Sequence, residues 1–170
     1  YNDGVKGLQL PYDVPANEFM NIEGDKFSKS RNWAIWLPDI LERYQADAIR
    51  YYTAAAMPET RDADFAWDGF LSRVNNELVA AWGNLCNRLL SFAYKRYEGR
   101  VPECGTLTPR DETLITLAEN GFKVCGELLE KVELREALST AMGIVREANT
   151  YLSEQEPWKL IKTNPDDAAR

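Results

Sequence analysis

Apolar residues recur at helical spacing along most of this 170-residue chain. Between residues 67 and 97 they follow one another at steps of three and four, which is the period of an amphipathic helix and not of a strand. The stripe consists of Trp67, Leu71, Val74, Leu78, Trp82, Leu85, Leu89 and Phe92. We therefore predict one long helix from Trp67 to Tyr97, ended by Gly99, with both tryptophans of the stripe in the core.

The same period predicts two further long helices. The string Thr-Pro-Arg-Asp at 108–111 is a helix start, because the Thr can cap the helix, the Pro suits its first position and the Asp can complete a capping box. An apolar stripe follows at 114–129, and another at 134–152. Pro157 then interrupts the pattern before a short final segment, and we expect residues 164–170 to fray.

The N-terminal part of the chain predicts shorter elements. Residues 14–22 favour one extended strand that ends at the turn 23–25. Because one strand cannot form a sheet, we expect its partners to lie outside this sequence. A short helix is predicted at 38–44, and a second at 47–56 with Asp47 as its cap. Residues 60–65 are expected to form an acidic turn.

These elements indicate an all-α fold. Each predicted helix has a single apolar stripe and the connections are short, which favours an antiparallel helix bundle. The bundle is preceded by a short irregular or β segment. No run of 18 apolar residues is present, so we expect neither a membrane span nor a membrane partner.

Composition excludes several kinds of chemistry. The chain has no histidine, which rules out His-based acid–base catalysis, Ser-His-Asp triads and His-ligated metals. Cys86, Cys104 and Cys125 lack CxxC spacing, and without a secretory signal they are typical of a reducing cytosolic compartment. Asp62 and Asp64 have no further ligands nearby in sequence, so we interpret them as a solvated, capping turn and predict no bound metal.

Charge is unevenly distributed along the chain. The net charge is −7, which argues against a protein that binds nucleic acid over a broad basic face. Residues 84–100 nevertheless form a basic island with Glu98 as its one acidic residue. Its basic members are Arg88, Lys95, Arg96 and Arg100. Such an island suits a negatively charged partner that is bound locally.

One short motif points to phosphate chemistry. The string at 25–31 reads Asp-Lys-Phe-Ser-Lys-Ser-Arg. Lys26 and Lys29 are three residues apart with serines at 28 and 30, so a mobile loop here can bring two ammonium groups to a polyphosphate. The alternative is a solvated basic turn.

This string resembles the second signature of class I aminoacyl-tRNA synthetases, Lys-Met-Ser-Lys-Ser, with Phe27 in place of Met. Further blocks in the same order resemble methionyl-tRNA synthetases. They are YQADAIRYY at 44–52, RDADF at 61–65, RVN at 73–75, NLCNR at 84–88 and EQEPW at 154–158. Synthetases for isoleucine, valine, leucine and cysteine share the loop and a helical bundle, but are not expected to share the last two blocks together.

The resemblance implies a ligase that joins methionine to its tRNA through methionyl-adenylate, with ATP as the energy source. The family's first signature, His-x-Gly-His, is absent, and so is its zinc-bearing insertion. The resemblance therefore implies a C-terminal piece of the enzyme that does not catalyse aminoacylation by itself. Residues 1–32 correspond to the end of a Rossmann-type catalytic domain, 33–66 to stem-contact helices and 67–170 to the anticodon-binding bundle.

By the same resemblance, the loop formed by Lys26, Phe27, Ser28, Lys29 and Ser30 belongs to the catalytic machinery. Lys26 and Lys29 are the expected catalytic residues, and Lys29 is the expected ATP ligand.

A second set of residues is implied in anticodon recognition. Asn84, Arg88 and Trp158 are expected to read the first base of the anticodon CAU. Asn84 and Arg88 are four residues apart and share a helix face, and their side chains can hydrogen-bond a base edge. Trp158 can stack on a base, with Pro157 fixing its approach. Taken singly, each has a structural alternative: an exposed amide, a surface cation and a lid on the core.

Three basic residues beyond Arg88 have two interpretations. Lys95, Arg96 and Arg100 can contact phosphates of the anticodon stem, or simply complement the negative end of a helix.

Three alternatives to recognition of the CAU anticodon also remain: a helical protein–protein interaction module, the anticodon domain of a sister synthetase, and an inert scaffold. The expected partners are the methionine tRNA and the catalytic half of the same enzyme, in the cytoplasm.

Overall fold

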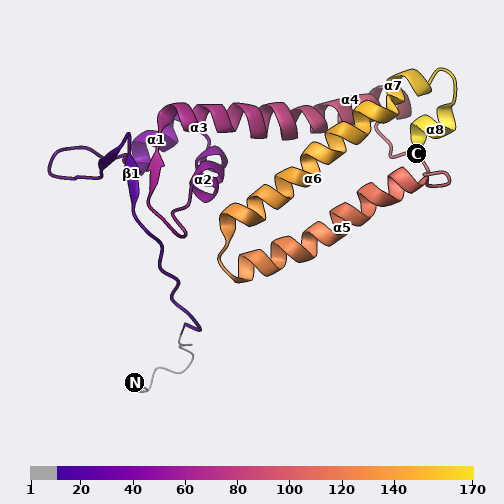
Figure 1. Cartoon of the computed structure of the whole chain (residues 1–170). Coiled ribbons are helices and arrows are strands. Elements are labelled where there is room, and N and C mark those ends of the chain that lie inside the picture. Colours follow the sequence, from indigo (N-terminus) through magenta and orange to yellow (C-terminus); the bar gives the residue numbers. More distant parts are fainter. Residues whose placement is uncertain (1–10) are drawn as a thin grey trace, which may run out of the picture.

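The computed structural model describes residues 11–170 and is mainly helical (Figure 1). In chain order the elements are β1 (Met20–Ile22), β2 (Asp25–Lys26), α1 (Leu37–Arg43), α2 (Ala46–Ala55), β3 (Ala63–Phe65), α3 (Trp67–Arg73), the π-helix η1 (Val74–Gly83), α4 (Asn84–Tyr97), α5 (Pro109–Glu130), α6 (Leu134–Gln155), α7 (Pro157–Leu160) and α8 (Pro165–Ala169). The predicted helical fold with a short β segment before it is confirmed.

The small sheet has the order β2-β1-β3. β1 is antiparallel to β2 and parallel to β3, with Ile22 opposite both Asp25 and Phe65. Glu23 and Gly24 make the turn with positive φ angles of 49° and 81°, as the sequence predicted for this position. The expectation that the strand's partners lie outside the chain is wrong, because β2 and β3 are those partners.

The acidic segment before the long helix is also more than a turn. Residues 63–65 form β3, which a three-residue apolar pattern is too short to reveal. Asp62 accepts a hydrogen bond from the backbone N–H of Phe19 at 3.1 Å, and Asp64 accepts one from Gly24 at 2.9 Å. The two carboxylates are exposed as predicted, but they bind backbone N–H groups of the β1 segment across the sheet and cap no described helix, so the predicted capping role is wrong. Asp47 lies in the first turn of α2 but is not its cap, which is Gln45.

A compact aromatic and aliphatic cluster joins α1, α2, β3 and α3. Its buried members are Ile40, Ile49, Tyr52, Phe65 and Phe70. The ring of Phe70 meets those of Tyr44 and Tyr52 edge-on, with centroids 5.0 and 5.5 Å apart. Such pairs stabilise beyond their buried area. Trp67 packs partly buried against this cluster, at the site where the long helix begins.

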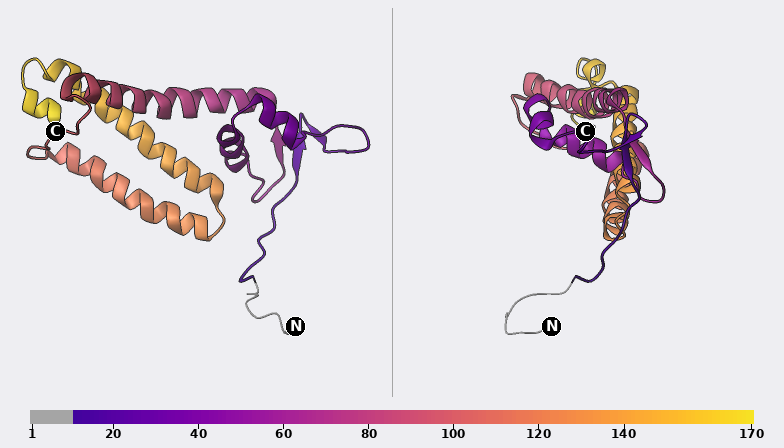
Figure 2. Two further views of the ribbon diagram at one scale, coloured as in Figure 1. Left: turned by 180° about the vertical axis from the view of Figure 1, so that it is seen from behind. Right: turned by 90° about the vertical axis from the view of Figure 1, so that its left-hand side faces the viewer.

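The predicted helix from Trp67 to Tyr97 is present as the continuous run α3–η1–α4 (Figures 1 and 2). Its end is marked by positive φ angles at Glu98 and Gly99. The middle of the run is π-helical, and i→i+5 bonding places more residues in each turn than an α-helix does. The apolar stripe therefore drifts, and Trp82 is 51% exposed. Its predicted place in the core is wrong.

Helices α5 and α6 form an antiparallel hairpin, and α6 crosses to the long helix while its first turn lies near α2 (Figures 1 and 2). Buried Gly121 lets the two helices approach, because the side chain of Ile144 occupies the space that a Cβ would need. Several apolar side chains of α5 face solvent, Phe122 among them.

The C-terminal segment is folded, so the prediction that residues 164–170 fray is wrong. Asn164 caps α8, and the guanidinium of Arg170 lies 3.0 Å from the carboxylate of Asp111 at the start of α5. Asp111 also accepts hydrogen bonds from the Thr108 backbone N–H at 2.7 Å and the Tyr151 hydroxyl at 2.6 Å. The predicted capping box is confirmed. Spacing along the chain cannot reveal the additional contact with Arg170.

Asp111 remains ionised in this buried position. Burial alone would raise its pKa, but the hydrogen bonds from Tyr151 and Thr108 and the charge of Arg170 together lower the pKa below its ordinary 3.8. Burial, with the neighbouring carboxylate of Asp111, raises the pKa of Tyr151 to about 12. The hydroxyl therefore stays a donor and the carboxylate an acceptor near neutral pH.

The hairpin packing predicts opposite effects for two glycines of α5. Gly126→Ala adds a methyl group in open space and should stabilise the chain by about 0.5–1 kcal/mol through helix propensity. Gly121→Ala forces Ile144 to move, so its free energy of unfolding should lie about 1–2 kcal/mol below that of Gly126→Ala. Urea unfolding of both variants checks this, and equal values would contradict the packing.

The Asp111 cluster predicts a pH-dependent loss of stability. Asp111→Asn should destabilise the chain by about 2–3 kcal/mol at pH 7, because buried Arg170 loses the nearer of its two charged partners and keeps only Asp167 at 3.5 Å. A carboxyl with a lowered folded pKa stabilises above its unfolded pKa, and this contribution is lost as pH falls through the folded value. The difference between wild type and variant should therefore shrink below pH 3.8. Urea titrations across this range, with exposed Glu127→Gln as control, measure it.

Candidate functional site

The lysine-bearing loop begins at β2 and projects from one end of the molecule (Figure 1). Ser28 and Trp33 close it by two backbone hydrogen bonds of 2.8 and 2.9 Å. The indole N–H of Trp33 donates to the Ile22 carbonyl at 3.2 Å, which ties the base of the loop to β1. The loop is therefore anchored at its base while its tip extends outward.

Lys26 and Lys29 are both exposed, and neither forms an ion pair with another residue of 11–170. Lys29 is at the tip, where its carbonyl accepts the N–H of Asn32 at 3.1 Å. The hydroxyls of Ser28 and Ser30 are 3.3 Å apart beside it. Two unpaired ammonium groups and two hydroxyls on one loop suit an anionic ligand with several phosphate oxygens.

The second set of predicted residues belongs to α4 and α7, two helices that lie close together toward the far end of the long helix (Figure 1). Glu156 ends α6 in a left-handed conformation with φ of 44°, and Pro157 begins α7. An ion pair of 2.7 Å between Lys159 and Glu156 spans this turn. The reversal of the chain carries Trp158 to α4.

The structure brings Arg88 and Trp158 together. The guanidinium carbon of Arg88 lies 4.9 Å from the centroid of the Trp158 ring, which is cation–π geometry. Asn84 is one turn earlier on α4 and exposed. Trp158 remains 37% exposed, so it is more than a lid on the core, and its ring is partly open beside the guanidinium of Arg88.

The remaining basic residues continue this surface. Lys95 and Arg96 are in the last turn of α4, and Arg100 follows it; all three are exposed. In the part of the chain that the structure describes, none of them pairs with a carboxylate. They give the far end of the long helix a positive surface on an acidic chain.

Sequence reasoning missed the residues that support this end. Arg110 bonds Glu154 at 2.8 Å and Glu147 at 2.7 Å, and its guanidinium lies over the ring of Tyr151. These contacts hold the start of α5 against the second half of α6, which leads into α7. No sequence motif marks them, because the partners lie on separate helices.

Three further features of the described residues are their possible metal ligands, their cysteines and the apolar character of their helices. Residues 11–170 contain no group of three or more His, Cys, Asp or Glu side chains placed to hold a metal ion. Cys86, Cys104 and Cys125 are free thiols. Among the described helices, none combines the length and apolar character that crossing a membrane requires.

Comparison with known families divides the chain into two matches. A family described as "tRNA synthetases class I (M)" matches residues 2–90. A second, described as "Anticodon binding domain of methionyl tRNA ligase", matches residues 101–170.

Known proteins agree with both matches. The methionine–tRNA ligase of Roseiflexus sp. (strain RS-1) is 55% identical over 98% of this chain, and that of Thermomicrobium roseum is 52% identical over 96%. The chain spans about 28% of the length of either relative. The methionyl-tRNA synthetase of Mycobacterium tuberculosis, solved with methionyl-adenylate, superposes with a TM-score of 0.86 at 25% identity, over 96% of this chain and 33% of that one.

The contact between Arg88 and Trp158 predicts a spectroscopic effect. Arg88→Ala removes the cation from the ring face, so the indole N–H resonance of Trp158 should shift in a ¹H–¹⁵N spectrum. Trp158→Phe identifies that resonance among the five tryptophans. Lys95→Ala, on the same helix, is the control and should leave it in place. An unchanged resonance in Arg88→Ala would show that the two side chains are apart in solution.

Proposed function

The chain belongs to the methionyl-tRNA synthetase family of class I aminoacyl-tRNA synthetases, and from this premise we propose that Asn84, Arg88 and Trp158 read the first anticodon base of the methionine tRNA. The observation that carries the proposal is the contact of Arg88 with Trp158, which joins residues 70 positions apart at one exposed surface. Trp158 lies in the match of 101–170 to the family's anticodon-binding domain, which supports this location, while Asn84 and Arg88 lie at the end of the match of 2–90.

The chemistry of these side chains suits an unstacked cytosine. Its Watson–Crick edge has an amino donor and two acceptors, a ring nitrogen and a carbonyl oxygen. The amide of Asn84 can both accept and donate, and the guanidinium of Arg88 donates in a planar fork. Trp158 offers a ring on which a splayed base can stack, the mode by which proteins commonly read single-stranded RNA.

We assign a supporting role to Lys95, Arg96 and Arg100. Their charges lie about two to three turns beyond Arg88 and can meet phosphates of the anticodon stem. Such contacts fix the position of the RNA without reading its sequence. The protein–protein interaction module is the less favoured alternative, because both family matches are to tRNA synthetases.

We further propose that Lys26 and Lys29 bind ATP phosphates, with Lys29 as the main ligand, when the family's whole enzyme forms methionyl-adenylate and passes methionine to the tRNA. The exposed, unpaired state of both lysines on an anchored loop supports this role. The remainder of the enzyme is the proposed protein partner, and the cytoplasm the proposed location. Catalysis by these 170 residues alone is not expected, since no histidine is present for the family's first signature.

The division into a catalytic-domain segment (1–32), stem-contact helices (33–66) and an anticodon-binding bundle (67–170) is part of the proposal. Residues 1–10 of the first segment lie outside the described residues.

Binding of two RNA hairpins tests the proposed recognition. One carries CAU, and in the other the first anticodon cytosine is replaced. The chain should prefer CAU by about 1–3 kcal/mol, or on the order of ten- to a hundredfold in Kd. Trp158→Ala should abolish the preference, while Trp82→Ala, at an exposed tryptophan of η1, should retain it. Equal binding of both hairpins by the wild-type chain would refute the proposal.

A further inference from the structure

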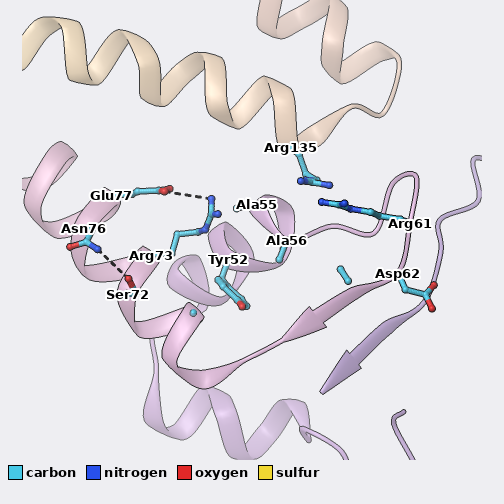
Figure 3. A pocket seen from close by; sticks show the side chains of 12 residues that line it. Tyr52, Ala55, Ala56, Arg61, Asp62, Ser72, Arg73, Asn76, Glu77 and Arg135 are labelled. Atoms are coloured by element: carbon cyan, nitrogen blue, oxygen red, sulfur yellow. Dashed lines mark hydrogen bonds and ion pairs between the residues drawn. The ribbon is translucent and has the colours of Figure 1, made fainter. Parts of the chain in front are cut away.

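A second basic surface lies at the opposite end of α6 from Trp158. It is a cavity of about 460 Å³ where α2, β3, the α3–η1 junction and the first turn of α6 meet. Arg61, Arg73 and Arg135 line it from three different elements (Figure 3). Arg146 lines a smaller adjoining cavity, which shares Arg73 and Arg135.

Arg73 pairs with Glu77, but Arg61 and Arg135 face one another without such a partner. Figure 3 shows the side chains of Arg61 and Arg135 pointing toward each other across the cavity. Within residues 11–170, neither forms an ion pair. Two like charges that converge in this way repel each other, and an anion between them would remove the repulsion.

Each of the nearby acidic groups already binds a partner within the protein. Glu77 pairs with Arg73 at 3.5 Å and also accepts the hydroxyl of Tyr51. Asp62 accepts the backbone N–H of Phe19. Glu59, beside the first turn of α6, accepts the backbone N–H of Arg135 at 2.9 Å. The lining thus has three guanidinium groups against the two carboxylates of Asp62 and Glu77, an excess of one positive charge.

We propose that this arginine groove, defined by Arg61, Arg73 and Arg135, binds a phosphate group of the RNA backbone. A guanidinium matches a phosphate with two parallel hydrogen bonds, and three from separate elements can surround one. Tyr52 is the one aromatic residue of the lining, and its hydroxyl bonds Ala66, so the groove suits backbone and not a stacked base.

The position of the groove supports a role with the same RNA. The inference rests on the proposed function, since it assigns a second contact to the RNA whose anticodon meets Trp158. Helix α6 has 22 residues and spans roughly 33 Å between the two surfaces. On a chain of net charge −7, two basic surfaces at the ends of one helix are suited to an extended polyanion held at two points.

Binding of a complete methionine tRNA transcript and of the CAU hairpin, each at several salt concentrations, tests the groove. The double variant Arg61→Gln/Arg135→Gln should bind the transcript about tenfold more weakly at low salt, with a salt slope smaller by about 1–2. Hairpin affinity and its preference for cytosine should be unchanged. Arg50→Gln, on α2 outside the groove lining and equal in charge change per residue, is the matched control.

The outcomes separate the two proposals. If the double variant binds the transcript as the wild type does, while Trp158→Ala still loses its preference for cytosine, the groove proposal fails and anticodon reading stands. If the double variant weakens transcript binding but the wild type shows no cytosine preference, the groove stands and anticodon reading fails. If inorganic phosphate binds the wild-type chain but not the double variant, while both bind the transcript equally at every salt concentration, the site takes free phosphate and its assignment to RNA is overturned.

Discussion

The contact of Phe70 with the small sheet and α2 sets the direction of everything that follows it in the chain. Phe70 is 1% exposed and is the most deeply buried large side chain among the described residues. It lies in the first turns of the long helix, so the burial of one ring fixes where that helix leaves the body. With 31 residues the helix extends roughly 45 Å, and a small change of angle at Phe70 moves its far end by several ångströms.

The far end is held by polar contacts, in contrast to the apolar anchor. Asp111 accepts hydrogen bonds from Thr108 in the cap of α5 and from Tyr151 in α6, and it forms an ion pair with Arg170, which follows α8. Trp158 lies on the segment between the last two. The proposed base-reading surface thus depends on a buried carboxylate. Its partners Tyr151 and Arg170 hold the α7–α8 segment from both sides. Such a network is rigid when every member is satisfied.

The long helices can be predicted from periodicity because their apolar stripes are long. The Thr108 capping box can be predicted because it depends only on residues close together in the sequence. The same reasoning failed where partners are distant. β3 depends on hydrogen bonds from the 19–24 segment, and α8 depends on the pair between Arg170 and Asp111. For the site, Asn84 and Arg88 could be placed on one face from spacing, but Trp158 was linked to them through family resemblance. The arginine groove had no sequence signal, since its members come from three elements.

Because η1 lies between Phe70 and α4, the number of residues in this π-helical stretch determines the direction in which the side chains of α4 face. Phe70 fixes the rotation of the helix at its start, and each α-helical residue after it turns the following side chains by about 100°. Removing one residue between 74 and 83 while the i→i+5 bonding of the rest of the stretch persists would leave the rod intact, yet it would turn α4 about its own axis. Arg88 would then face away from Trp158. In homologous chains, insertions and deletions in this stretch should therefore be selected against because they rotate α4, and not because they destabilise the helix.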